Sequence, residues 1–354
     1  MADKVGVHRV AALAKVSIGT VDRALHGRAG INPQTRDRVL LIARELGYEP
    51  NLAARALSKR RAAHVRIGVC VPRELRFFYD QLWEGIYDEV RRSRDYGIDF
   101  VFRPLPELGA GEAEEIKRLV KSGVQGIILT PGRPDTTTPV INQAERAGVR
   151  VVCVSTDAPA SQRSSIVCVE PRLSGQLAGE LMARCLPPRS SVAVVTGMLA
   201  TENHARKCEG FAASFARFCP GGRVAEVIEG HEEAAECGLK VEALLARLPQ
   251  LAGIYVNTVN CLPVAEALEA RGRASRVKLI TTDLFREMVP YFDRDTICAS
   301  IYQRPYQQGR NAVAMLVDHL FQQTPLASAS YLNPSLVLHS NLHLFRELRA
   351  HHSA

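Results

Sequence analysis

The sequence predicts two kinds of folded unit: a small all-α headpiece, and an α/β core of two lobes, each built on a doubly wound parallel sheet. Three observations predict this division. The chain has 354 residues, too many for one ordinary hydrophobic core. The first 66 residues hold 13 Lys or Arg and 5 Asp or Glu, whereas the remainder holds 32 of each sign. Beyond residue 65, short apolar runs alternate with helical stretches, as in parallel sheets covered on both faces.

Composition excludes several other classes of protein. No run of about 18 uncharged apolar residues is present, so no membrane span is expected. The first ten residues lack the apolar segment of a secretory signal, so we expect a cytoplasmic protein. The nine cysteines are scattered without a CxxC pair, which predicts buried thiols rather than a zinc site or a disulfide framework. The ten histidines are dispersed, and we expect neither a metal nor a cofactor.

Helical periodicity predicts two short helices at the start of the basic segment. The first covers about Arg9–Ala14. The second is Ile18–Leu25, with Ser17 at its N-cap. The three-residue connection between them has the length of the tight link in a helix-turn-helix. The residues expected to face inward are Val10, Leu13, Val21 and Leu25.

A third helix is predicted by a capping residue followed by a proline. Asn32 and Pro33 mark its start, and Gly47 marks its end. Helices this short are marginal alone, so the three must share one small core. Their basic surface suits a polyanion such as DNA, although charge alone would also fit a solvated basic face. The apolar stripe of the third helix is formed by Val39, Ile42 and Leu46.

Residues 7–57 carry a set of short motifs in a common register: VA-x-x-A, VS-x-x-TV-x-R-x-L, T-R-x-x-V and LGY-x-PN. On these motifs the segment resembles the headpiece of the lactose-repressor (LacI) family. The resemblance implies that the second helix lies in the major groove of DNA. It places Ile18, Gly19 and Arg23 at base-reading positions, and Ser17 and Thr20 near phosphates. The other DNA-contacting residues that it implies are His8, Asn32, Asn51, Ala54 and Leu57.

Side-chain chemistry indicates what two of these positions would read. The Arg23 guanidinium can donate to guanine O6 and N7, and Ile18 can contact a thymine methyl group. Gly19 departs from the family, in which many members carry a longer polar side chain there. One base contact is therefore absent, and the operator of a relative cannot be carried over.

The segment Leu52 to Ser58 resembles the hinge helix of the same family. A helix of about seven residues is unstable alone. The resemblance implies that it folds when two copies meet on DNA, with Leu57 as a wedge in the minor groove. Lys59, Arg60 and Arg61 follow, where they can meet phosphates. The alternative interpretation is a plain basic linker.

Ten apolar runs are expected to form the strands of the core. We expect a headpiece at 1–49, a hinge and linker at 50–64, and an effector-binding and dimerisation domain at 65–354. Its N-lobe is expected at about 65–165 and 297–328, and its C-lobe at about 166–296 and 329–354, with a ligand cleft at the strand ends between them. The expected strands are 65–71, 98–104, 126–131, 149–155, 166–169, 191–197, 224–230, 252–257, 278–283 and 297–303.

The core resembles the periplasmic-binding-protein-like domain of the LacI family, close to ribose- and galactose-type sugar binders. The resemblance implies that aromatic residues stack on a sugar ring. Asp283 and Gln303 stand at strand ends, where a carboxylate and an amide can bind vicinal hydroxyls. The effector-binding residues implied in this way are Phe77, Phe78, Ser155, Thr156, Asp157, Lys207, Asn257, Thr258, Asp283 and Gln303.

Two departures from the family bear on the ligand. Ser155 stands where the family has an aspartate, and Lys207 replaces an arginine, so a point charge replaces a bidentate fork. They leave a sugar acid, a phosphosugar or a polyol open beside a neutral sugar. The alternative roles also stay open: a core position for Phe77 and Phe78, a turn cap for Asp157, a solvated charge for Lys207, and a hinge role for Asp283 and Gln303.

These features predict a DNA-binding transcription regulator, a repressor controlled by a small-molecule effector, expected to be a sugar or a sugar derivative. A homodimer on a near-palindromic operator is expected, because a two-fold protein requires a two-fold site. No heptad repeat follows Leu348, which favours a dimer over a tetramer. Enzymatic motifs are not found, and His231-Glu232 lacks the second histidine of HExxH. The alternatives are a sugar-binding transport component and a sugar-processing enzyme.

Overall fold

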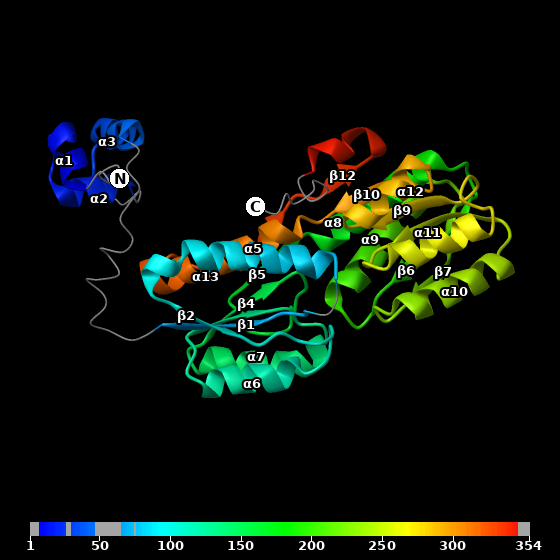
Figure 1. The fold of residues 1–354 in the computed structure, drawn as a ribbon, viewed down its shortest axis with the longest axis horizontal. Helices are drawn as coiled ribbons and strands as arrows, with labels where there is room; N and C mark the ends of the chain where they lie inside the picture. The colour runs from blue at the N-terminus through cyan, green and yellow to red at the C-terminus, as the bar shows by residue number, and fades with distance from the viewer. Residues whose placement is uncertain (1–6, 26–29, 47–64, 74–75, 346–354) are drawn as a thin grey trace. The chain divides into compact units, whose positions relative to one another are not determined.

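The computed structural model describes residues 7–25, 30–46, 65–73 and 76–345 (Figure 1). The chain divides into two compact units, a headpiece within Met1–His64 and a core that begins at Val65. Each unit has a hydrophobic core of its own. No helix of the described residues is long and apolar enough to cross a membrane.

The headpiece consists of three short helices around one small core. They are α1 (Val7–Ala14), α2 (Ile18–Leu25) and α3 (Pro33–Glu45), and their extents confirm the three helices predicted from the sequence. Both predicted caps are formed. Ser17 Oγ accepts the Thr20 N–H at 3.2 Å, and Asn32 Oδ1 accepts the Gln34 N–H at 2.9 Å. Each cap satisfies one backbone donor that the first turn of a helix leaves free.

The inward position predicted for Leu13 is wrong, because this side chain is 54% exposed. At 100° per residue, the buried face of α1 is centred between Val10, Ala11 and Ala14 and lies about 100° from Leu13. Small alanine side chains fill the centre of the headpiece instead. The buried residues of the headpiece core are Val10, Ala11, Ala14, Val21, Ala24, Val39 and Ala43.

Two six-stranded sheets form the core. The N-lobe sheet has the order β11-β5-β4-β3-β1-β2, with all its strands parallel. Its strands are β1 (Arg66–Cys70), β2 (Asp99–Phe102), β3 (Gly126–Leu129), β4 (Arg150–Val154), β5 (Ser165–Val169) and β11 (Ser330–Leu332).

The C-lobe sheet repeats this arrangement in the order β12-β10-β9-β8-β6-β7, and only β12 is antiparallel to its neighbour. Interior strands are buried on both faces, whereas the edge strand β7 alternates. The strands are β6 (Ser191–Thr196), β7 (Arg223–Glu229), β8 (Leu251–Val256), β9 (Lys278–Thr282), β10 (Ile297–Tyr302) and β12 (Ser335–Val337).

Helices cover both faces of each sheet (Figure 1). In the N-lobe, α5 (Phe78–Arg92) and α13 (Pro305–Gln322) cover one face, and α6 (Glu112–Lys121) and α7 (Pro134–Arg146) cover the other. In the C-lobe the corresponding pairs are α8 (Pro171–Cys185) with α9 (Glu202–Phe218), and α10 (Ala234–Arg247) with α11 (Cys261–Ala270). Shorter elements are α12 (Val289–Asp293) and the 3-10 turns η1 (Arg94–Tyr96), η2 (Arg286–Met288) and η3 (His339–Leu344).

The expected boundaries between the lobes differ from the observed strand pairing. β5 pairs with β4 in the N-lobe, although residues from 166 onward were expected in the C-lobe. β10 pairs with β9 in the C-lobe, although 297–328 was expected in the N-lobe. The chain therefore crosses between the lobes after β5, after β10 and after β11. An apolar run predicts a strand, but only backbone hydrogen bonding decides which sheet the strand joins.

Candidate functional site

A cleft lies where the carboxyl ends of the strands of both sheets meet, as doubly wound sheets predict. It encloses about 410 Å³ outside the protein atoms, its open mouth included. The N-lobe contributes Phe78, Tyr79, Leu108, Ser155 and Thr156. The C-lobe contributes Thr201, Asn203, His204, Lys207, Glu232, Asn257, Thr258, Val259, Asp283 and Gln303.

Lys207 places an ammonium group in the cleft from the middle of α9, and the residue is only 3% exposed. A Cβ at Gly175 of α8 would overlap the Lys207 carbonyl, so the glycine allows α9 to pack this closely. Burial lowers the pKa of Lys207, while the carboxyl groups of Asp283 and Glu232 act against that shift. The residue is therefore no solvated helix charge, which was one of its two possible roles.

Asp283 and Gln303 follow neighbouring strands and bind each other. Gln303 Nε2 donates to Asp283 Oδ1 at 2.7 Å, and both side chains line the cleft. Burial raises the pKa of Asp283 to about 6, although Lys207 and the Gln303 amide lower it. Asp283 has a left-handed backbone (φ 73°), and so does Ser155 (φ 73°), which follows the corresponding strand of the N-lobe. Strained residues of this kind cluster at binding sites.

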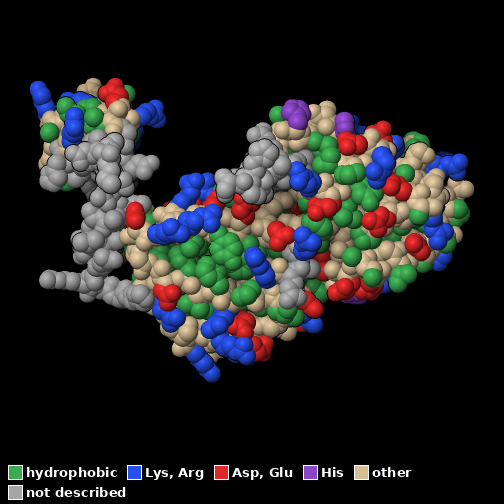
Figure 2. Space-filling view, viewed as in Figure 1, with side chains coloured by type: hydrophobic (Ala, Val, Ile, Leu, Met, Phe, Trp, Pro, Cys, Tyr) green, Lys and Arg blue, Asp and Glu red, His purple; other side chains and the backbone are tan. Residues whose placement is uncertain are grey.

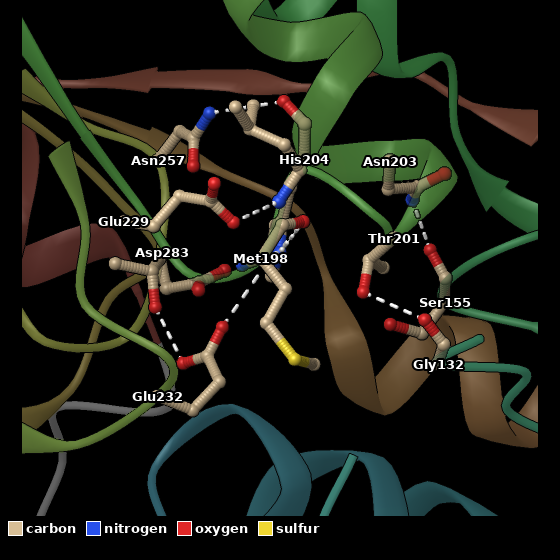
Figure 3. A network of polar contacts seen from close by, with 12 residues as sticks. Gly132, Ser155, Met198, Thr201, Asn203, His204, Glu229, Glu232, Asn257 and Asp283 are labelled. Atoms are coloured by element: carbon tan, nitrogen blue, oxygen red, sulfur yellow. Dashed lines mark hydrogen bonds and ion pairs between the residues drawn. The ribbon is translucent and has the colours of Figure 1, made fainter. Parts of the chain in front are cut away.

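Glu232, His204 and Thr258 form a polar network in the C-lobe part of the cleft (Figure 3). Thr258 Oγ1 donates to Glu232 Oε2 at 2.5 Å, and His204 Nε2 lies 3.3 Å from Glu232 Oε1. The Met198 N–H donates to His204 Nδ1 at 3.1 Å. Burial lowers the pKa of His204 to about 3, with Lys207 adding to the shift. Burial raises the pKa of Glu232 to about 7.

Three oxygen atoms of cleft residues have no hydrogen-bond partner within the described part of the chain. They are Asn203 Oδ1, Asn257 Oδ1 and Thr156 Oγ1. Buried polar atoms are nearly always hydrogen-bonded, to protein, water or ligand. Two of the three can only accept a hydrogen bond. The cleft is therefore suited to a ligand rich in donors, such as hydroxyl groups.

Hydrogen bonds also join the two lobes across the cleft. Thr201 Oγ1 donates to the Gly132 carbonyl at 2.8 Å, and the Asn203 amide donates to the Ser155 carbonyl (Figure 3). A third bond joins α5 of the N-lobe to the segment after β9 of the C-lobe, where Gln81 Nε2 donates to the Leu284 carbonyl at 2.7 Å. Because these partners come from both lobes, opening of the cleft would break the bonds.

Two residues expected in the cleft lie elsewhere. Phe77 stacks on Phe285 with ring centroids 4.0 Å apart and an interplanar angle of 12°, so its ring packs on the C-lobe core. Asp157 Oδ2 accepts from Arg163 Nη2 at 2.7 Å, and its Oδ1 accepts the Ala158 N–H at 2.8 Å. The turn-capping role left open for Asp157 is thus the observed one. The structure brings together the other eight: Phe78, Ser155, Thr156, Lys207, Asn257, Thr258, Asp283 and Gln303.

Sequence reasoning missed seven lining residues, and some of them carried a usable signal. Asn203 and His204 lie four and three residues before Lys207 on one helix, so helical periodicity places them on the same face. Glu232 follows β7 closely, and the strand-end argument applied to Asp283 also covers it. The seven are Tyr79, Leu108, Thr201, Asn203, His204, Glu232 and Val259.

In the headpiece, α2 presents an exposed face at its first turns. Ser17, Gly19 and Arg23 are exposed, and Ile18 is 42% exposed, while Val21 is buried. Thr20 is half-buried, and its hydroxyl bonds the Ser17 hydroxyl at 2.9 Å. Asn32 caps α3 and is exposed. The side chain of His8, and Asn51, Ala54 and Leu57, lie outside the described residues.

A helix-turn-helix headpiece joined to a two-lobed periplasmic-binding-protein fold is the architecture of a class of bacterial regulatory proteins. The family model of bacterial regulatory proteins of the lacI family matches residues 7–51, and that of the periplasmic binding protein domain matches residues 67–324. The chain belongs to the LacI family of DNA-binding transcription regulators, which are not enzymes.

Curated relatives and solved structures agree with this placement. Catabolite control protein A of Priestia megaterium is 25% identical over 325 residues, which cover 90% of this chain and 94% of that protein. The ribose operon repressor of Bacillus subtilis is 34% identical over 126 residues, 36% of this chain and 37% of that protein. GanP, a glucose-galactose binding protein from Geobacillus stearothermophilus, has a TM-score of 0.72 at 24% identity, over 79% of this chain and 99% of that chain; this likeness shows the fold.

Proposed function

We propose that the protein is a homodimeric repressor whose affinity for a near-palindromic operator is controlled by a sugar or sugar derivative bound in the cleft. The observation that carries the proposal is the cleft itself, which combines buried charged groups at strand ends with oxygen atoms that lack donors. The names of two similar proteins, a ribose operon repressor and a glucose-galactose binding protein, point to the same ligand class. We propose a cytoplasmic location, because the operator DNA that the protein would bind lies there.

The DNA-binding half of the proposal is supported by the exposed face of α2. Arg23 is available to donate to a guanine, and Ile18 to contact a thymine methyl group. The net charge of the first 66 residues is +8, which would supply the non-specific attraction to phosphates. Figure 2 shows Lys and Arg side chains over the headpiece, and acidic and basic side chains interspersed over the core.

Control by a ligand follows from the make-up of the cleft. A ligand that touches Phe78 and Ser155 of the N-lobe as well as Lys207 and Asp283 of the C-lobe favours one angle between the lobes. That angle would set the distance between the hinge segments of a dimer. A coupling free energy of about 1–3 kcal/mol is enough to change operator affinity about 5- to 150-fold.

Operator selection tests the proposal directly. The full chain is incubated with random double-stranded DNA, and the enriched sequences are read. A near-palindromic site is expected, whose affinity then changes when one of a panel of neutral sugars, polyols, sugar acids and phosphosugars is added. The same panel is screened by thermal shift, because a ligand at 100 times its Kd stabilises the protein by about 2.7 kcal/mol. Failure to enrich any sequence would contradict the operator-binding role.

Two further measurements address the dimer and the hinge. Light scattering is expected to give twice the chain mass of 38.9 kDa, and a tetramer would contradict the dimer.

Leu57→Ala is expected to weaken operator binding and reduce DNA bending, because an inserted apolar side chain unstacks a base step. Unchanged affinity and bending would leave the hinge segment as a plain basic linker.

A further inference from the structure

Glu232 is a carboxylate of the cleft that is held from three sides. Thr258 Oγ1 reaches one of its oxygens at 2.5 Å, and His204 Nε2 lies 3.3 Å from the other. On the third side, a Cβ added at Gly197 would overlap Glu232 Oε1. The side chain of Glu232 is only 9% exposed. Residues from three other segments thus build a place for this one carboxyl group.

The backbone is strained at Glu232, which lines the cleft. His231 and Glu232 both adopt left-handed conformations, with φ of 50° and 62°. Such a conformation is unfavourable for a non-glycine residue. The neighbouring His231 is exposed and pairs with Glu236 at 3.0 Å, so it does not share the role of Glu232. Strain that persists at a cleft residue indicates a function in binding.

The charges that face Glu232 do not balance. Lys207 and His204 on α9, Asp283 after β9 and Tyr79 on α5 are its titratable neighbours. His204 is neutral at physiological pH, so Lys207 is the one cation among them, facing the two carboxyl groups of Asp283 and Glu232. When Asp283 and Glu232 are both ionised, one negative charge is left over. A buried charge without a counter-charge is costly, so a ligand that supplies one positive charge gains affinity.

The hydrogen-bonding atoms of the cleft favour the same kind of ligand. The cleft residues offer several hydrogen-bond acceptors. They are the unpaired Asn203 Oδ1 and Asn257 Oδ1 and the carboxylate oxygens. An ammonium group brings three donors and no acceptor, and hydroxyl groups bring further donors. A phosphate or carboxylate group on the ligand would instead place its own acceptor oxygens against the acceptor oxygens of the cleft. Lys207 is the one cation among these neighbours that could bind such a group.

We propose that the effector is an amino sugar, a small polyhydroxylated molecule with one protonated amine. The amine binds Glu232, and the hydroxyls bind Asp283, Asn257 and Gln303. This inference rests on the proposed function of the cleft as a sugar-effector site, and it names the substituent that distinguishes the effector from a neutral sugar.

Matched sugar triplets test the proposal on the full chain at pH 7. Each triplet contains a hexose, its 2-amino form and its N-acetyl form, in the gluco, galacto and manno series, with glucose 6-phosphate and glucuronate as anionic probes. Isothermal titration calorimetry is expected to show at least one amino sugar binding tenfold or more tighter than both of its partners. Tighter binding of a neutral or anionic probe would overturn the amine assignment and leave the sugar-effector function standing. No binding in any class would overturn both.

Variants at Glu232 and Gly197 separate the role of Glu232 in ligand binding from any role in folding. Glu232→Gln is expected to reduce the preference for the amine to twofold or less, while the neutral hexose keeps its affinity within about threefold. Gly197→Ala displaces the carboxylate without removing it, and a smaller loss of the same preference is expected. Glu236→Gln, which alters a half-buried carboxylate outside the cleft lining, is the control and should keep the full preference. An unchanged preference in folded Glu232→Gln or Gly197→Ala would overturn the proposal.

Discussion

The headpiece and the core present their functional side chains in opposite ways. In the headpiece, Ile18 and Arg23 are exposed over a small core that includes Val21 and Val39. In the core domain, Lys207 and Asp283 are each 3% exposed, and they interact with other cleft residues. The residues proposed to read DNA are therefore separate from those that stabilise the headpiece. In the cleft, the residues proposed to bind the effector also take part in the buried interactions of the core. Substitutions in the cleft should change stability and binding together, and those on α2 should change binding alone.

The largest effect is expected from Asp283→Ala in the cleft. The substitution leaves the Gln303 amide without its partner and removes one of the two carboxyl groups that face the Lys207 ammonium. We expect the free energy of unfolding to fall by about 2–4 kcal/mol, since unsatisfied buried groups cost about 1–3 kcal/mol each. Effector affinity should fall at least about 100-fold, equivalent to about 2.7 kcal/mol. Urea denaturation and calorimetry measure the two quantities.

Asp293→Ala is the matched control, because this aspartate is exposed on α12. We expect it to change stability by less than about 0.5 kcal/mol. If Asp283→Ala were as stable as this control, the dual role assigned to cleft residues would be refuted.

The next effect concerns the pH dependence of stability at Glu232. Burial raises its pKa in the folded protein from 4.5 to about 7, so the folded state holds a proton that the unfolded state releases between these values. The stability that this proton contributes is present below pH 4.5 and is lost as pH rises to 7. Relative to Glu232→Gln, the free energy of unfolding of the wild type should fall by about 1–3 kcal/mol across this window, because each unit of pKa shift corresponds to about 1.4 kcal/mol.

Urea denaturation of both proteins at several pH values between 4.5 and 8 measures this difference. Comparison of the two proteins cancels the opposite trend from His204, whose lowered pKa makes the fold more stable as pH rises from about 3 to 6.5. Parallel stability curves for the two proteins would mean that Glu232 is ionised in the ligand-free cleft.

A smaller effect, and one confined to binding, is expected from Arg23→Ala on α2. Loss of a bidentate contact to guanine should relax discrimination at one base pair by about 1–3 kcal/mol. The melting temperature should not change, because the side chain is exposed. Binding to a set of single-base operator variants measures the discrimination. A uniform loss over all variants would make Arg23 a phosphate contact.

The smallest effect is expected at Ser17, which caps α2 and is also exposed on the surface proposed to contact DNA. Ser17→Ala removes the oxygen that accepts the Thr20 N–H and should destabilise the headpiece by about 1 kcal/mol. Ser17→Gly is the matched control, since glycine at an N-cap costs only a few tenths of a kcal/mol. Both variants should lose the same operator affinity if the hydroxyl meets a phosphate. Retained affinity in Ser17→Gly would restrict Ser17 to its capping role.

The local features of the fold were predictable from the sequence because they depend on neighbours along the chain. The caps at Ser17 and Asn32 and the periodicity around Val39 mark the headpiece helices within a few residues. Each of the ten apolar runs overlaps a strand of the structure, with strand starts within one residue of the expected ones. β11 and β12 were missed because strands of three residues carry no periodic signal.

The sequence by itself determined the family, the helices of the headpiece and eight of the cleft residues, since motifs and strand ends are local properties. Only the tertiary structure decided that β5 belongs to the N-lobe and β10 to the C-lobe, and that Phe77 stacks on Phe285. It also decided that Glu232 meets His204 and Thr258 in the cleft. The physical reason is that strand pairing and side-chain proximity are contacts between residues far apart in the chain, and no local pattern encodes which distant residues will meet.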